Sequence, residues 1–307
     1  MGPVAGLLRR LLADTWRTIE AEREPDDAAS TAAATPLAAE ASAAASTDAA
    51  PPLAAEASAA AAPAAAPFDF RPLVILVTVA VCLTLQEYIG EREFFRQQFP
   101  SLAAGGYGEL RSYAWWSSWR FIGYVVIPSV VVLCLPGMRL GDTYVSLRQF
   151  RRHYRIYVVL FLLVLPFVIG AAQFRAFYYT YPFYKWANRS AFDFWTWEAL
   201  YALQFVSLEF FFRGFILHGL RRRFGAGAIF VMIVPYCMIH YGKPMAETMG
   251  AIVAGLVLGT LAMRTRSIWG GAAIHIAVAL TMDVLAVHQC PPPDAGMRCP
   301  SAGDFPQ

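Results

Sequence analysis

The stretch ALYALQFVSLEFFFRGFILHGL, residues 199–220, decides the fold of this chain. It is apolar almost throughout, and its 22 residues are enough to cross a bilayer as a helix. Glu209 and Arg213 stand four residues apart within it, on one face of that helix. Each charge costs roughly 2.5–3.5 kcal/mol at a bilayer centre, so the pair predicts a functional site. A structural ion pair is the plainer interpretation of the same residues.

The composition predicts an all-α, polytopic membrane protein. Of the 307 residues, 57% are hydrophobic and 15% are charged, whereas soluble domains have about 25% charged residues. The mean hydropathy is +0.44. A net charge of only +3 and the lack of a glycine-rich phosphate loop argue against a nucleic-acid partner. The apolar composition instead predicts that the protein works in the lipid bilayer.

Seven apolar segments predict about seven transmembrane helices. They cover residues 72–89, 115–135, 154–173, 194–220, 226–241, 245–263 and 267–288. Lys and Arg gather in alternate connections, as in the 137–153 loop and at residues 221–223. The positive-inside rule then predicts a cytoplasmic N-terminus and an external C-terminus. We expect an integral protein of a bacterial inner membrane.

Composition divides the chain into five regions. They are an amphipathic surface helix (1–24), a disordered Ala/Pro-rich linker (25–67), N-terminal transmembrane helices (68–190), a core that carries the polar residues (191–288) and an external tail (289–307). The first helix can equally pack on a partner or on the rest of the chain. In the tail, Cys290 and Cys299 can form a disulfide if that tail faces an oxidising compartment.

Further ionisable residues fall in or beside the last three segments, at depths comparable with that of Glu209. They are His240, Lys243, Glu247, His275 and Asp283. Taken singly, each histidine can serve as a hydrogen-bonding partner of a neighbouring helix. Glu247 can complement a helix N-terminus, and Lys243 can anchor the interface. Their presence together with Glu209 favours a site.

The chemistry open to these residue types is narrow. A glutamate and two histidines can hold a water molecule, either as ligands to a divalent metal such as zinc or as a metal-free base with hydrogen-bond donors. Arg213 would keep Glu209 ionised despite its burial. A water activated in this way attacks a carbonyl carbon, so the residues predict amide hydrolysis within the membrane.

Residues 195–287 resemble the CAAX protease and bacteriocin-processing (CPBP, or Abi) family of intramembrane proteases. The family motif EExxxR is similar to Leu208-Glu209 through Arg213, FxxxH to Tyr236 through His240, and HxxxN to His275 through Ala279. The resemblance implies that the glutamates and the first histidine activate water. It also implies that the second histidine and the asparagine stabilise the oxyanion.

Two positions depart from the family pattern: Leu208 replaces the first glutamate and Ala279 the asparagine. We hypothesise that Glu247 substitutes for the missing glutamate and Asp283 for the missing asparagine. The predicted catalytic residues are Glu209, His240, His275 and Glu247, with Arg213, Asp283 and Lys243 in support, and the candidate metal ligands are Glu209, His240 and His275.

The resemblance implies an endopeptidase that cleaves a membrane-embedded or lipid-anchored protein near its terminus. An inactive scaffold or immunity-type relative that binds a membrane partner is the first alternative, and the two departures favour it. A proton-coupled transporter is the second, because midplane carboxylates and histidines can form a relay. No internal repeat among the apolar segments supports the transporter.

Overall fold

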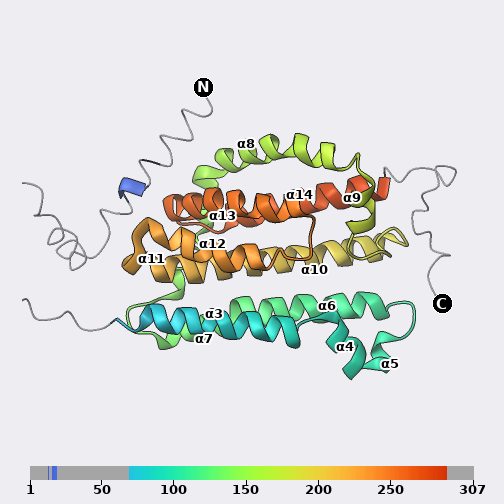
Figure 1. The fold of residues 1–307 in the computed structure, drawn as a ribbon, viewed down its shortest axis with the longest axis horizontal. Coiled ribbons are helices and arrows are strands. Elements are labelled where there is room, and N and C mark those ends of the chain that lie inside the picture. Colours follow the sequence, from blue (N-terminus) through green and yellow to red (C-terminus); the bar gives the residue numbers. More distant parts are fainter. Residues whose placement is uncertain (1–12, 14–15, 19–68, 289–307) are drawn as a thin grey trace, which may run out of the picture.

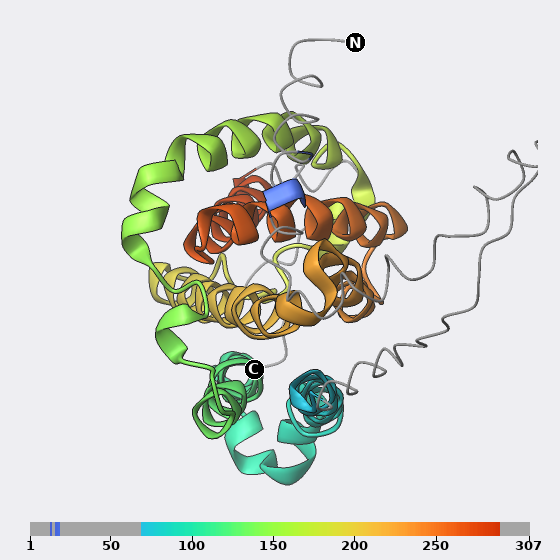
Figure 2. The same ribbon diagram turned by 90° about the vertical axis from the view of Figure 1, so that its left-hand side faces the viewer.

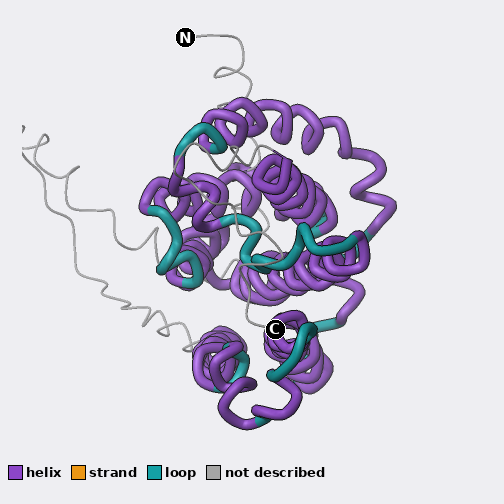
Figure 3. The backbone as a smooth tube through the Cα atoms, turned by 90° about the vertical axis from the view of Figure 1, so that its right-hand side faces the viewer, coloured by secondary structure: helices purple, strands orange, loops and turns teal. Residues whose placement is uncertain are grey.

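The computed structural model describes residues 13, 16–18 and 69–288. Within this part of the chain the backbone is helical, apart from connections and one antiparallel bridge between Val145 and Ser267 (Figure 3). The predicted all-α class is therefore confirmed. Most of the 1–24 helix, the 25–67 linker, and the 289–307 tail with its two cysteines lie outside the described residues, so these features stay predictions.

The first helices form one outer layer of the bundle (Figure 1). They are α3 (Arg71–Tyr88), α4 (Arg92–Gln98), α5 (Pro100–Ala103), α6 (Gly108–Phe121), the π-helical turn η1 (Ile122–Val126) and α7 (Ile127–Cys134). Pro72, in the first turn of α3, needs no amide partner there. Gln86 is buried inside the layer, where its side-chain amide donates to the Trp119 carbonyl at 2.6 Å.

The 3₁₀ turn η2 (Leu140–Asp142) leads into α8 (Leu147–Ala171) and the short α9 (Arg175–Thr180). Ser146 caps α8 by accepting from the Gln149 amide at 3.4 Å. Viewed end-on, α8 passes round the outside of α13 and α14 (Figure 2). Its outer face exposes valines, leucines and Phe167, which is the surface expected of a helix against lipid.

The remaining helices carry the predicted polar residues. They are α10 (Ala191–Glu209), the π-helical turn η3 (Phe210–Leu217), α11 (His218–Phe224), the 3₁₀ turn η4 (Gly225–Gly227), α12 (Ala228–Met238), α13 (Met245–Thr265) and α14 (Trp269–His288). In Figure 1, α10 and α12 lie between the first layer and the pair α13 and α14. The polar residues are therefore surrounded by helices.

Six helical stretches in the described part of the chain are long and apolar enough to cross a membrane. The longest, Ala191–Met238, contains two of the seven predicted segments. The chain reverses direction between these two segments at Gly225, where φ is 53°. α12 is only 11 residues long and ends at Met238. His240 was expected within a helix and instead lies in the turn between α12 and α13, so that boundary was wrong. The stretches support an integral membrane protein.

The main apolar core joins α3, α7, η3, α12 and α13 around buried phenylalanines. Phe211, Phe212 and Phe215 are fully buried in it. Trp16, from the predicted N-terminal helix, packs against this core and stacks edge-on with Phe230 at 5.9 Å. The described part of the N-terminal segment thus contacts the rest of the chain, as one of the two interpretations of this segment allows.

Candidate active site

Glu209 is the last residue of α10, at the point where the helix widens into the π-helical turn η3. Only 1% of its side chain is exposed, and Arg213, fully buried one turn later, brings Nη1 to 3.0 Å from Glu209 Oε1. The Arg213 guanidinium also lies over the Tyr236 ring, 4.3 Å from its centroid. π-Helical turns are rare and occur often at functional sites. The predicted pair is thus assembled and enclosed.

His275 on α14 completes this cluster. Its Nε2 lies 3.2 Å from Glu209 Oε1 and 3.2 Å from the Tyr236 hydroxyl. Phe205 of α10 stacks on the imidazole, with the rings 5.3 Å apart and 3° from parallel. Stacking on one side and polar contacts at Nε2 fix the ring. Three helices therefore bring Glu209, His275 and Tyr236 together.

The glycine pair before His275 lets α14 come close to two side chains. A Cβ atom on Gly271 would lie 2.2 Å from Glu209 Oε2 and 2.6 Å from its Cδ, far inside contact distance. A Cβ on Gly270 would lie 2.0 Å from the Tyr157 ring. Only glycine at these positions allows the carboxylate to sit against the α14 backbone.

A cavity of about 1150 Å³ adjoins the cluster. Its polar end is lined by Tyr236, His240, His275 and Glu247. The rest of its wall is mainly apolar and includes Phe167, Phe174, Phe177, Val278 and Ala279. Glu209 and Arg213 are not among the lining residues and lie behind His275 and Tyr236. Large apolar cavities with a few convergent polar groups are typical of ligand sites.

The turn after α12 supplies the second histidine. His240 Nδ1 lies 2.7 Å from the Tyr236 carbonyl, and because that oxygen can only accept, Nδ1 carries the proton and Nε2 of the neutral ring is the free acceptor. The imidazole packs edge-on against the Tyr236 ring at 4.9 Å. His240 therefore presents a basic nitrogen from a residue that lines the cavity.

Glu247 reaches the same cavity from the first turn of α13. Lys243 Nζ donates to its Oε1 at 2.6 Å, and the Tyr181 hydroxyl donates to its Oε2 at 2.6 Å. Burial and the Glu247 carboxylate raise the pKa of Tyr181 above its usual range, so Tyr181 keeps the proton that it donates. Glu247 and Lys243, predicted from sequence, are thus placed at the cavity with an additional tyrosine.

The candidate metal ligands Glu209, His240 and His275 are not gathered around one point. Within the described ranges, no group of three or more His, Cys, Asp and Glu side chains is arranged to hold a metal ion. His275 Nε2 already faces Glu209 and Tyr236, and Glu209 does not reach the cavity that His240 lines. The donor set therefore does not fit a zinc site.

The departures from the motifs have different surroundings. Leu208 is buried in the main apolar core, whereas Ala279 lines the cavity. Asp283 lies elsewhere: it is fully buried and accepts a hydrogen bond from the Trp197 indole at 2.6 Å, beside Glu198. It is not among the residues that line the cavity of His275. The expected His275–Asp283 partnership is not assembled, because Asp283 faces α10 rather than the cavity.

Sequence reasoning missed three contributors: Tyr236 as a hydroxyl donor, Tyr181 and Gly271. Tyr236 was the detectable one, since it stands where the family motif has phenylalanine and adds a polar group four residues before His240. Gly271 lies four residues before His275, but glycine has no side chain to reveal a close contact. Tyr181 belongs to the α9–α10 connection, which carried no motif.

Residues 190–281 match the family described as type II CAAX prenyl endopeptidase Rce1-like. The match is consistent with the CPBP family and confirms the resemblance for this segment, which contains all three motifs. It supports CAAX-type intramembrane protease activity in general terms. No curated protein and no solved structure matches the chain.

Proposed function

We propose that this protein is an intramembrane endopeptidase that hydrolyses a peptide bond near the terminus of a membrane-embedded or lipid-anchored protein. The observation that carries the proposal is the buried Glu209–His275–Tyr236 cluster at the polar end of an apolar cavity. The family match over 190–281 supports the protease class. The apolar wall suits a lipid anchor or an apolar peptide segment.

The cavity residues divide the work of hydrolysis. His240 Nε2, unprotonated, accepts a proton from water, and Glu247 is the second carboxylate at the same end of the cavity. The water oxygen then attacks the carbonyl carbon, and His240 passes the proton it accepted to the departing amine as the C–N bond breaks. Glu247 is held in place by its bonds to Lys243 and Tyr181. Its removal is expected to slow the reaction without abolishing it.

Glu209 acts through His275. A carboxylate 3.2 Å from Nε2 favours the tautomer that carries a proton there. Nε2–H then donates to the Tyr236 oxygen, so the tyrosine accepts and its own O–H is free to donate. In this arrangement the Tyr236 hydroxyl stabilises the oxyanion in place of the family's asparagine, and Glu209 and Arg213 are positioning residues.

The test uses purified protein in proteoliposomes and a library of quenched fluorescent peptides, each made with and without a C-terminal lipid anchor. We expect anchored peptides to be cleaved, and His240→Ala to lower the rate by about 100-fold or more. Tyr241→Ala, an exposed neighbour outside the cavity, serves as the matched control and should retain the wild-type rate. Equal rates for wild type and His240→Ala would contradict the proposal.

An inactive scaffold remains the second candidate, and one observation favours it. Ala279 presents only a methyl group to the cavity where the family pattern has asparagine. A scaffold would bind anchored peptides in the cavity and release them uncut. Binding of the library without cleavage by wild type would support this function over the protease.

A further inference from the structure

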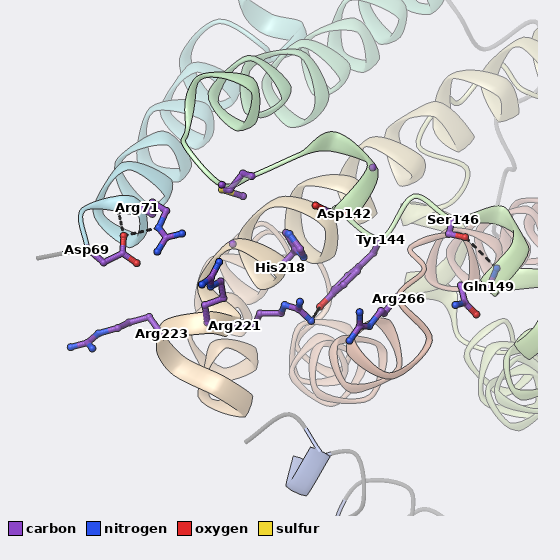
Figure 4. A pocket seen from close by; sticks show the side chains of 15 residues that line it. Asp69, Arg71, Asp142, Tyr144, Ser146, Gln149, His218, Arg221, Arg223 and Arg266 are labelled. Atoms are coloured by element: carbon purple, nitrogen blue, oxygen red, sulfur yellow. Dashed lines mark hydrogen bonds and ion pairs between the residues drawn. The ribbon is translucent and has the colours of Figure 1, made fainter. Parts of the chain in front are cut away.

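A second pocket lies at the end of the bundle where the basic connections meet, apart from the cavity just described (Figure 4). It has a volume of about 320 Å³ and shares no lining residue with that cavity. Five arginines line it, against two aspartates: Arg71, Arg221, Arg222, Arg223 and Arg266, with Asp69 and Asp142. Its formal charge is thus strongly positive.

The arginines come from three separate places in the chain. Arg71 begins α3, Arg221 to Arg223 end α11, and Arg266 follows α13. Asp69 forms an ion pair with Arg71, with Nε 2.8 Å from Oδ1, and this contact holds the pKa of Asp69 below its usual range. Long-range folding therefore gathers positive charge that the sequence spreads over almost 200 residues.

Two residues with an unusual backbone conformation line the same pocket. Tyr144 (φ 61°) and Arg266 (φ 50°) are the two non-glycine residues with positive φ in the described part of the chain, and both line it. Such conformations are uncommon for bulky side chains and cluster at ligand clamps. They are held by neighbouring contacts: the Ile268 amide donates to the Tyr144 carbonyl at 2.8 Å, and the Ser267 hydroxyl to the Ser146 carbonyl at 3.0 Å.

Tyr144, an aromatic residue that lines the pocket, is held in place by two neighbouring side chains. Arg221 donates to the Tyr144 hydroxyl at 3.4 Å, and His218 packs edge-on against the Tyr144 ring at 5.1 Å (Figure 4). Guanidinium groups match the paired oxygens of a phosphate better than any other side chain does. The pocket volume is at the lower end of the range for small-ligand sites, which fits a phosphate with a short polar group attached.

Apolar residues beside the pocket indicate where the phosphate comes from. Phe70 and Leu73 flank Arg71 on α3, and Leu147 follows Ser146; all three are more than half exposed. We propose that this pocket binds the phosphate of an anionic lipid headgroup, with the acyl chains lying along these exposed side chains. Basic pockets between helices at a membrane surface hold such headgroups.

The experiment titrates full-length protein in detergent with phosphatidylglycerol, with phosphatidylcholine and inorganic phosphate as comparison ligands, using native mass spectrometry. The pocket variant is Arg222→Gln/Arg223→Gln/Arg266→Gln. Its matched control is Arg148→Gln/Arg151→Gln/Arg152→Gln, which removes the same charge from exposed positions on α8 outside the pocket. We expect phosphatidylglycerol binding to weaken about tenfold or more in the pocket variant and less than about twofold in the control.

Equal weakening in both variants, or none in the pocket variant, would overturn the pocket as the binding site. Displacement of the lipid by an equal concentration of inorganic phosphate would overturn the lipid headgroup in favour of free phosphate. Thermal unfolding of each variant is measured alongside. If the triple variant is destabilised, Arg266→Gln against Arg151→Gln repeats the comparison with single exposed residues, and the same outcomes decide it.

Discussion

Two carboxylates are buried between α10 and α14, and their surroundings differ. Glu209 lies 3.0 Å from Arg213 and 3.2 Å from His275, next to a large cavity. Asp283, two turns beyond His275, accepts from the Trp197 indole and has Glu198 as its acidic neighbour. Burial alone therefore does not identify a carboxylate that belongs to the candidate site. Glu209 contacts His275, which lines the cavity. Among the contacts described, Asp283 touches no histidine of this kind.

The largest expected difference comes from neutralising each carboxylate in turn. Glu209→Gln should lower kcat by about 100-fold, because the amide no longer holds the proton on His275 Nε2 that orients the Tyr236 hydroxyl. Asp283→Asn keeps an oxygen acceptor for Trp197 and should cleave at the wild-type rate. Peptide cleavage in proteoliposomes measures both. A rate loss in Asp283→Asn as large as that in Glu209→Gln would remove the distinction.

Gly271→Ala tests the position of Glu209 without changing its charge. The new Cβ would collide with the carboxylate, and a displacement of about 1 Å can cost about 100-fold in rate. Gly170→Ala on α8 is the control, since its Cβ would meet nothing within 4 Å. Both variants are compared by kcat and by thermal unfolding. Full activity in Gly271→Ala would show that the precise place of Glu209 is unimportant.

Tyr236→Phe tests the hydroxyl group that faces His275. Loss of one hydrogen bond to a developing charge should lower kcat by about 10- to 100-fold while KM changes little. The ring remains to pack against Arg213 and His240, so the fold is retained. Tyr241→Phe, in the exposed part of the same turn, is the matched control. An unchanged kcat in Tyr236→Phe would exclude the hydroxyl from the reaction.

Replacing Asp283 by alanine is expected to change the stability of the protein rather than its cleavage rate. Asp283→Ala removes the acceptor of the buried Trp197 indole, which should lower the free energy of unfolding by about 1–3 kcal/mol. Denaturation in detergent measures the change, with Asp283→Asn as the conservative control. Asp283→Ala as stable as wild type would show that the bond to Trp197 has no structural value.

The smallest effect is expected from metal removal. The predicted ligands do not converge on one point, so treatment with a strong chelator should leave the cleavage rate within about twofold of the untreated protein. Inductively coupled plasma analysis of the same sample gives its zinc content. Loss of activity on chelation, restored by zinc, would contradict the metal-free arrangement.

Hydropathy and charge were sufficient to predict the class of fold, because spanning helices must be long and apolar. The meeting of Glu209, Arg213 and His275 was also accessible, since few other groups offset a buried charge. The surroundings of Asp283 could not be predicted from the sequence. Eight residues after His275, at about 100° each, turn it about 80° round the helix and two turns away, so it faces a different neighbour.

The positions of Tyr236 and Gly271 depend on how helices are rotated and pressed together, and no single helix encodes that. Tyr236 meets His275 because α12 packs against η3 and α13. Gly271 matters because α14 approaches α10 closely enough to touch a carboxylate. Sequence patterns identify the polar residues, whereas packing decides which of them become neighbours.

The central claim is that water cleaves a peptide bond in the cavity beside Glu209 and His275. The most direct measurement is mass spectrometry of a lipid-anchored peptide incubated with the protein in ¹⁸O-labelled water. We predict a product of wild type with one ¹⁸O atom in its new carboxyl group, and about 100-fold slower formation of that product with His275→Ala. A labelled product formed equally by His275→Ala, or no cleavage of any anchored peptide by wild type, would contradict the account.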